Sequence, residues 1–157
     1  MSSLTSPDAA SADPKARQAW LSLLARAPST SVLRVWNAAK LAPDHIDLRA
    51  PEVGAVMVRG RAGAVGAPFN LGEMSVTRAS VRLRCGAIGH GYAQGRSTAH
   101  ARIAALVDAL MQTQVADAVR QAVLCPLEAE MSSAREARAS RAAATKVEFF
   151  TLVRGED

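Results

Sequence analysis

The spacing of apolar residues predicts two amphipathic helices at the start of the chain. Apolar positions recur at helical spacing over 13–27 and again over 29–39. Asp13-Pro14 is a typical helix start, because an acid can cap free N–H groups and proline fits the first turn. Ser29 is placed to cap the second helix in the same way.

The middle of the chain changes to a strand pattern. Nine of the ten glycines fall between Gly54 and Gly95, and apolar and polar residues alternate there. We predict strands at 53–59, 74–85 and 88–94 within a set of four, with a flexible connection at 60–66. In the long strand one face is small or apolar and the other is polar and cationic. The first comprises Thr77, Ala79, Val81, Leu83 and Cys85, and the second Arg78, Ser80, Arg82 and Arg84.

The last third returns to a helical period over 97–124, where Pro126 is expected to end or kink the helix. An alanine-rich helix is predicted over 128–145, and the β-branched and aromatic segment 146–154 is predicted to rejoin the sheet as a strand. The fold class is therefore α+β, with a mainly antiparallel sheet of four central strands plus a C-terminal strand and about four helices. Residues 1–12 are expected to be a flexible tail and 13–157 a single domain.

Composition indicates a thin core. Residues of the apolar types make up 49% of the 157, but 33 residues are alanine, which buries little surface. Large side chains are therefore scarce for a protein of this length. A partner that covers more of the surface is expected.

The charge is positive overall and unevenly distributed. The net charge is +5, with a pI near 10.0, and the whole basic excess falls within 49–102. Arginine accounts for 16 of the 19 basic residues, which suits planar, bidentate recognition of anions or carboxylates. An autonomous nucleic-acid-binding module is one function that fits this charge. The sequence offers few aromatic residues for stacking on bases, so a cationic sheet face or subunit contact is favoured.

Location and catalysis are constrained mainly by what the sequence lacks. The N-terminus has no secretory pattern and no apolar run reaches the length of a bilayer span, so we expect a cytoplasmic protein with no membrane contact. Cys85, His90 and His100 match no zinc spacing, and we predict no metal site. No paired carboxylates or activated nucleophile stand out, which disfavours a self-sufficient enzyme.

One corner has the composition of an anion site. The glycine-rich segment 89–95 is followed by Arg96 and by the predicted start of a helix that contains His100. A helix N-terminus with two basic side chains can bind phosphate or phosphonate. A purely structural corner, capped by Ser97, explains the same residues and is the favoured interpretation.

Several short motifs together resemble one known family. They are Trp20-Leu21-Ser22-Leu23-Leu24, Pro51-Glu52-Val53-Gly54, Met57-Val58-Arg59-Gly60-Arg61, Pro68-Phe69-Asn70-Leu71-Gly72-Glu73, Gly89-His90-Gly91-Tyr92, Ala105-Leu106-Val107-Asp108-Ala109-Leu110 and Val147-Glu148-Phe149-Phe150. In order and spacing they are similar to the G subunit of the bacterial carbon–phosphorus lyase system. The likeness extends over nearly the whole chain after the tail.

The resemblance implies a role in organic phosphonate breakdown. It implies a hetero-oligomer with the H, I and J subunits. It also implies that, with the H, I and L subunits, this chain supports formation of a ribose 1-phosphonate 5-triphosphate from ATP with release of adenine. ATP would be a substrate of the complex, and this chain would bind no cofactor and would not be catalytic alone. We predict that the interface or the edge of a site is formed by Arg59, Arg61, Glu73, Arg78 and Arg96, with His90 and His100 as further candidates.

Overall fold

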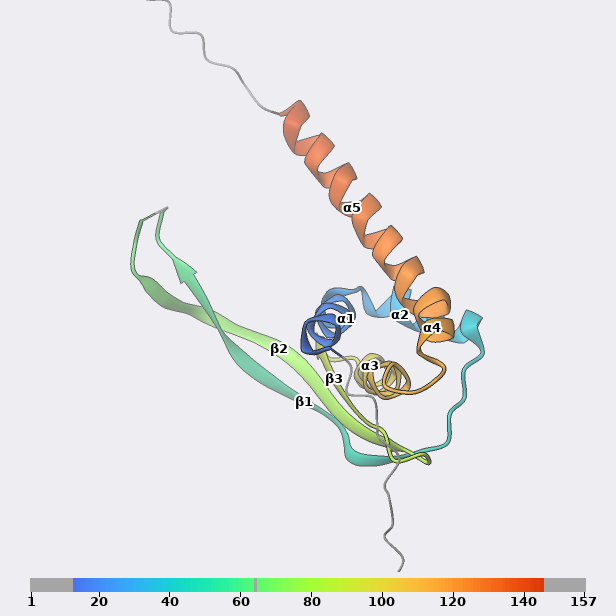
Figure 1. Ribbon diagram of the computed structural model, residues 1–157. Coiled ribbons are helices and arrows are strands. Elements are labelled where there is room, and N and C mark those ends of the chain that lie inside the picture. Colours follow the sequence, from blue (N-terminus) through green and yellow to red (C-terminus); the bar gives the residue numbers. More distant parts are fainter. Residues whose placement is uncertain (1–12, 64, 146–157) are drawn as a thin grey trace, which may run out of the picture.

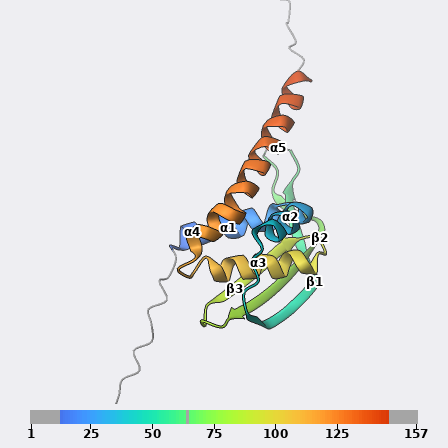
Figure 2. The same cartoon turned by 90° about the vertical axis from the view of Figure 1, so that its right-hand side faces the viewer.

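The computed structural model describes residues 13–63 and 65–145, which form an α+β fold (Figures 1 and 2). The elements in chain order are α1 (Pro14–Arg26), α2 (Ser29–Ala39), β1 (His45–Arg61), β2 (Pro68–Leu83), β3 (Ile88–Gln94), α3 (Thr98–Leu110), α4 (Ala116–Val119), the π-helical turn η1 (Arg120–Leu124) and α5 (Cys125–Ala144). The strands form one antiparallel sheet in the order β1-β2-β3. The predicted fold class is confirmed.

The first two helices lie where the sequence predicts them, but one predicted cap is wrong. Asp13 accepts a hydrogen bond from the backbone N–H of Lys15 at 3.1 Å and caps α1. α1 ends at an extended Ala27, as expected for a residue that precedes proline. The N-cap of α2 is Pro28, and no side chain caps this helix, although Ser29 is its first residue.

The sheet has three strands in the described part of the chain, so the prediction of four central strands is wrong. β1 and β2 are longer than the predicted segments 53–59 and 74–85. They pair from one end to the other with three register shifts, so part of the glycine-rich stretch predicted as a connection lies within the ladder. The predicted C-terminal strand at 146–154 lies outside the described residues.

The pairing assigns the side chains of the sheet to two faces, because directly opposed residues of an antiparallel pair share a face. The inner face, toward the helices, holds Thr77, Ala79, Val81 and Leu83 of β2 and their neighbours Gly89, Gly91 and Ala93 of β3. The outer face holds Arg78, Ser80 and Arg82, as predicted. Cys85 lies beyond the end of β2 and is exposed, so its predicted place on the packed face is wrong.

α3 lies directly on two glycines of the inner face. A Cβ atom at Gly91 would lie 1.9 Å from the carbonyl oxygen of Ala101, and one at Gly89 would lie 2.0 Å from that of Ala105. Every residue of α3 from His100 to Leu110, except one, is buried between the sheet and the other helices. The core is therefore built by close approach of small residues as much as by large apolar side chains.

Asp108 of α3 holds three elements together from within the core. Its fully buried carboxylate accepts hydrogen bonds from Arg17 Nε and Nη2 at 3.1 and 2.7 Å, and from Trp20 Nε1 at 2.9 Å. It also accepts the backbone N–H of His90, on the free edge of β3, at 2.9 Å. Each buried oxygen is thus satisfied, and one edge of the sheet is closed by side chains of its own helices.

The helix predicted over 97–124 is divided in two. α3 ends at Leu110, and a turn over 111–115 separates it from a second helical run formed by α4, η1 and α5. Pro126 neither ends nor breaks this run. The π-helical turn directly precedes it, where the N–H that proline lacks interrupts the regular hydrogen-bond pattern.

Two parts of the chain extend beyond the packed body in the same direction (Figures 1 and 2). One is the hairpin end, which we define as residues 53–61 of β1 and 68–75 of β2. The other is the last part of α5, residues 132–144, where every residue is exposed. No described helix is both long and apolar enough to cross a membrane. An exposed helix of this length has little stability of its own, so both extensions are suited to contact with a partner.

The glycine contact generates a test of the fold. We expect Gly91→Ala to destabilise the protein by about 3 kcal/mol, because the new methyl group would push α3 off the sheet. Gly54→Ala is the matched control, since nothing lies within 4 Å of its added Cβ, and its effect should stay below about 0.5 kcal/mol. Urea unfolding followed by circular dichroism measures both. Equal stability of the two variants would contradict the predicted close contact.

Candidate functional site

The structure separates the seven predicted site residues into four places. Arg59, Arg61 and Glu73 lie on the hairpin end. Arg78 and His90 lie on the outer face of the sheet, on neighbouring strands. Arg96 lies at the corner between β3 and α3, and His100 lies in the core. The candidates thus form three separate surface groups and one buried residue, and they do not come together in a single catalytic site.

On the outer face, one carboxylate joins two arginines. Glu52 of β1 accepts hydrogen bonds from Arg78 Nε and from Arg49 Nη1, each at 2.6 Å. These bonds, that from Arg78 first, hold the pKa of Glu52 below its ordinary value of 4.5. All three side chains are about half exposed, so the group adds little to stability. It fixes the guanidinium groups in place on an open surface.

A serine and a histidine lie side by side on the same face. Ser80 Oγ and His90 Nδ1 are 2.9 Å apart, across the β2–β3 pair. Nucleophilic catalysis also needs a group that orients the histidine and donors for an oxyanion. Within the described residues, no carboxylate is bonded to the ring of His90, since Asp108 contacts only its backbone. Ser80 and His90 therefore form a polar pair on the surface that can bind a partner, and they do not form a catalytic pair.

The corner between β3 and α3 has the predicted structural cap. Ser97 Oγ accepts the backbone N–H of His100 at 3.2 Å, and Gly95 adopts a positive φ of 92°. Arg96 reaches back to Ser75 Oγ at 3.4 Å. The guanidinium of Arg96 therefore lies at the base of the hairpin end, on the surface. It remains available for an anion or a partner there.

His100 is fully buried, away from any surface that an anion could reach. Its Nε2–H donates to the carbonyl oxygen of Leu24 in the last turn of α1 at 2.8 Å. Its Nδ1 has no partner among the described residues, and burial lowers the pKa of the ring from 6.5. The histidine is thus neutral at pH 7, and it ties the start of α3 to the end of α1.

The hairpin end has two chemically distinct faces. Met57 pairs with Glu73, and Arg59 with Asn70, on a polar and cationic face that also carries Arg61. The opposite face, continuous with the outer face of the sheet, is apolar. It carries Val56, Val58, Phe69, Leu71 and Met74. Phe69 is 45% exposed and Leu71 is 65% exposed, which is unusual for large apolar residues on a free surface.

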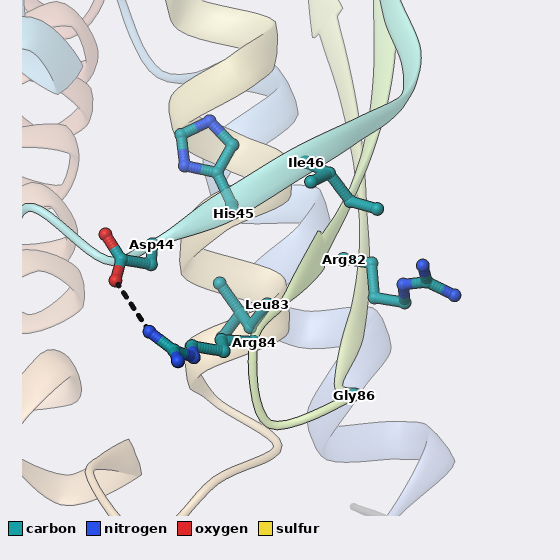
Figure 3. A pocket seen from close by; sticks show the side chains of 7 residues that line it. All are labelled: Asp44, His45, Ile46, Arg82, Leu83, Arg84 and Gly86. Carbon is teal, nitrogen blue, oxygen red and sulfur yellow. Dashed lines mark ion pairs between the residues drawn. The ribbon is translucent and has the colours of Figure 1, made fainter.

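A pocket of about 520 Å³ lies at the other end of the sheet (Figure 3). Asp44, His45, Ile46, Arg82, Leu83, Arg84 and Gly86 line it. Arg84 points toward Asp44, and its Nη1 lies 3.9 Å from Asp44 Oδ2, whereas the side chain of Arg82 points the opposite way (Figure 3). Because the two guanidinium groups diverge, this pocket lacks the converging donors that an anion would require.

Sequence patterns missed two features that the fold creates. Asp108 lies on a helical stripe, and nothing in the sequence pairs it with the distant Arg17 and Trp20. Arg135 and Arg138 of α5 lie 109 and 112 residues after Arg26 of α1, yet all three line one cleft. In both cases the only sequence signal is a charged residue in a helix with no partner nearby in the chain.

Among the described residues, no three histidine, cysteine, aspartate or glutamate side chains lie close enough together to hold a metal ion. Cys85 is exposed and His100 is buried, so the set considered from the sequence is not gathered in space. The described surfaces instead offer arginine guanidinium groups and apolar side chains. These groups bind anions and proteins.

Comparison of the chain with known proteins finds a matching family. The family described as "Phosphonate metabolism protein PhnG" matches residues 15–155. A protein of Rhizobium meliloti (strain 1021) is 44% identical over 153 residues, which cover 98% of this chain and 96% of that protein. It is named alpha-D-ribose 1-methylphosphonate 5-triphosphate synthase subunit PhnG.

Burial of His100 predicts a pH-dependent stability. Because the folded state lowers the pKa of the ring, the unfolded chain binds the proton more readily below about pH 6.5. The contribution of the neutral His100 ring to the free energy of unfolding is therefore present above pH 6.5. As the pH falls below that value, the free energy of unfolding decreases by up to about 1.4 kcal/mol per pH unit.

His100→Gln tests this dependence, because the glutamine amide can donate to Leu24 but cannot titrate. Urea unfolding between pH 7.5 and 5.5 should show a smaller loss of stability in His100→Gln than in the unchanged protein. The same slope in both proteins would show that other groups cause the dependence.

Proposed function

Because this chain belongs to the PhnG family of phosphonate metabolism proteins, we propose that it is a subunit of the carbon–phosphorus lyase system. It supports formation of ribose 1-methylphosphonate 5-triphosphate from ATP and a phosphonate, with release of adenine. The match to a named subunit of that synthase over 96% of the relative's length carries this proposal. Family membership favours this function over the autonomous nucleic-acid binder.

The chain works within a hetero-oligomer that contains the H, I, J and L subunits. The name of the relative, a subunit of a synthase, supports a multi-subunit enzyme. The triphosphate in the name of the product fits ATP as the substrate of that enzyme. In this proposal the chain binds no separate cofactor, and the chemistry requires its partners.

The two extensions form the assembly surface. On the hairpin end, Phe69 and Leu71 lie on an apolar face and the opposite face is cationic, so the hairpin offers both apolar and charged groups to a partner. α5 leaves the body after Leu127 and has no packing of its own beyond Met131. Burial of both against larger subunits compensates for the thin core that the composition indicates.

The predicted site residues have separate roles in this assembly. The surface groups contact partner subunits or border a site that the partners complete. They are Arg59, Arg61, Glu73, Arg78, His90 and Arg96. His100 acts as a positioning residue, since it holds the corner that carries Arg96 against α1.

Omission of the chain tests the subunit function directly. The H, I, J and L subunits are co-expressed with and without this chain, and adenine release from ATP with methylphosphonate is measured along with the mass of the purified complex. We expect the complex to contain this chain and adenine release to depend on it. Unchanged mass and unchanged products after omission would contradict the proposal.

Charge reversal on the hairpin end tests the assembly surface. We expect Arg61→Glu to weaken co-purification with the other subunits by about tenfold or more, because it places like charges in the interface. Arg84→Glu is the matched control at the other end of β2, where the side chain is 88% exposed. Equal retention of both variants in the complex would remove the hairpin end from the interface.

A further inference from the structure

A cleft is lined by residues of α5, by the last residue of α1 and by the last residue of β3. Its volume is about 570 Å³, within the range of small-molecule sites. We call it the arginine cleft; its lining comprises Arg26, Gln94, Met131, Arg135, Arg138, Ala139 and Ala142. It is separate from the hairpin end and from the outer face of the sheet.

The lining is cationic and contains no acidic residue. Arg135 and Arg138 form no hydrogen bond or ion pair with any other described residue. Two of the three acids of the same helix are engaged elsewhere, since Glu130 pairs with Arg34 at 2.6 Å and Glu136 accepts from Ser132 at 3.0 Å. Guanidinium groups that lack counter-charges and share a cleft are suited to bind an anion there.

Two of the carbonyl groups at the end of α1, which would repel an anion, are engaged in hydrogen bonds. A helix C-terminus carries partial negative charge on its free carbonyl oxygens. Here the carbonyl of Leu23 accepts the backbone N–H of Ala27 at 3.0 Å and that of Leu24 accepts from His100 Nε2 at 2.8 Å. Arg26 Nε donates to the carbonyl of Ser22 at 3.0 Å. Arg26 uses only Nε in this bond, so its two terminal nitrogens remain free to face the cleft.

The face of α5 that lines the cleft leaves room for a ligand to approach its two arginines. Arg135 and Arg138 are three residues apart and so share a face of the helix, while Ala139 and Ala142 leave space beside them. From Met131 to Ala142 the lining extends over about 16 Å of helix, which is more than one phosphate group needs. An extended anion with several charged groups fits this length and charge.

We propose that the arginine cleft binds a triphosphate group. Among extended anions we choose the triphosphate because ATP and the ribose 5-triphosphate carry one, and this choice rests on the proposed function. The guanidinium forks of Arg26, Arg135 and Arg138 engage the phosphate oxygens, and the amide of Gln94 adds a donor. In the complex, this chain then holds the end of the nucleotide that does not react.

Binding to the full-length chain tests the cleft without any other subunit. Titration calorimetry at about 50 mM salt would measure inorganic tripolyphosphate, ATP, methylphosphonate and adenosine as separate ligands. We expect tripolyphosphate and ATP to bind with similar affinity, methylphosphonate at least about tenfold more weakly, and adenosine not at all, because recognition is of the triphosphate.

Two arginine substitutions locate the binding. Arg135→Gln with Arg138→Gln should weaken tripolyphosphate binding by about thirtyfold or more, since two charge-assisted contacts are lost. Arg141→Gln is the matched control, since this arginine is on the same helix but does not line the cleft. Its affinity should stay within about twofold. Circular dichroism of each variant checks that α5 is still folded.

Three results would overturn the proposal. The first is no tripolyphosphate binding by the full chain or by the purified complex. The second is an equal loss in the Arg141 control, which would show general attraction to a basic surface. The third is unchanged tripolyphosphate binding in the double variant together with loss of the complex, which would assign the cleft to an acidic partner segment. Binding at these arginines by a chain that joins no complex would instead refute only the proposed function.

Discussion

The contact between α3 and the glycines of β3 is the constraint on which the rest of the structure depends. Because Gly89 and Gly91 have no side chain, the backbone of α3 lies directly on the sheet, and its alanines fill the space. Asp108 then reaches the edge of β3 and also the side chains of α1. Both its position and its hydrogen bonds follow from this short separation. The small body is therefore well ordered although it has few large apolar residues.

The scarcity of large apolar residues also explains why parts of the molecule are exposed. A body packed by small residues has little apolar surface left to cover the hairpin end or the last part of α5. These segments keep regular structure but carry Phe69, Leu71 and several arginines into solvent. A subunit that completes its burial in a complex has these features, and the match to a synthase subunit agrees with them. The arginine cleft is lined in part by the same stretch of α5.

The parts of the fold that depend on local residues could be predicted from the sequence, and those that depend on distant pairing could not. The cap at Asp13, the two faces of β2 and the start of α2 follow from nearby residues. The number of strands does not, because glycines that resemble a loop, such as Gly60 and Gly72, pair with residues of the opposite strand in the hairpin. His100 resembled a surface ligand because its spacing from Arg96 is visible in the sequence, whereas its partner Leu24 is 76 residues away. The arginine cleft was missed for the same reason.

Hydrogen–deuterium exchange of the chain, alone and in the proposed complex with the H, I, J and L subunits, tests the central claim most directly. The claim is that a body closed by small residues leaves the hairpin end and α5 for partners to cover. α3 should be protected in both states, while residues 53–61, 68–75 and 132–144 should gain protection only in the complex. Equal exchange of these segments in both states would contradict the account.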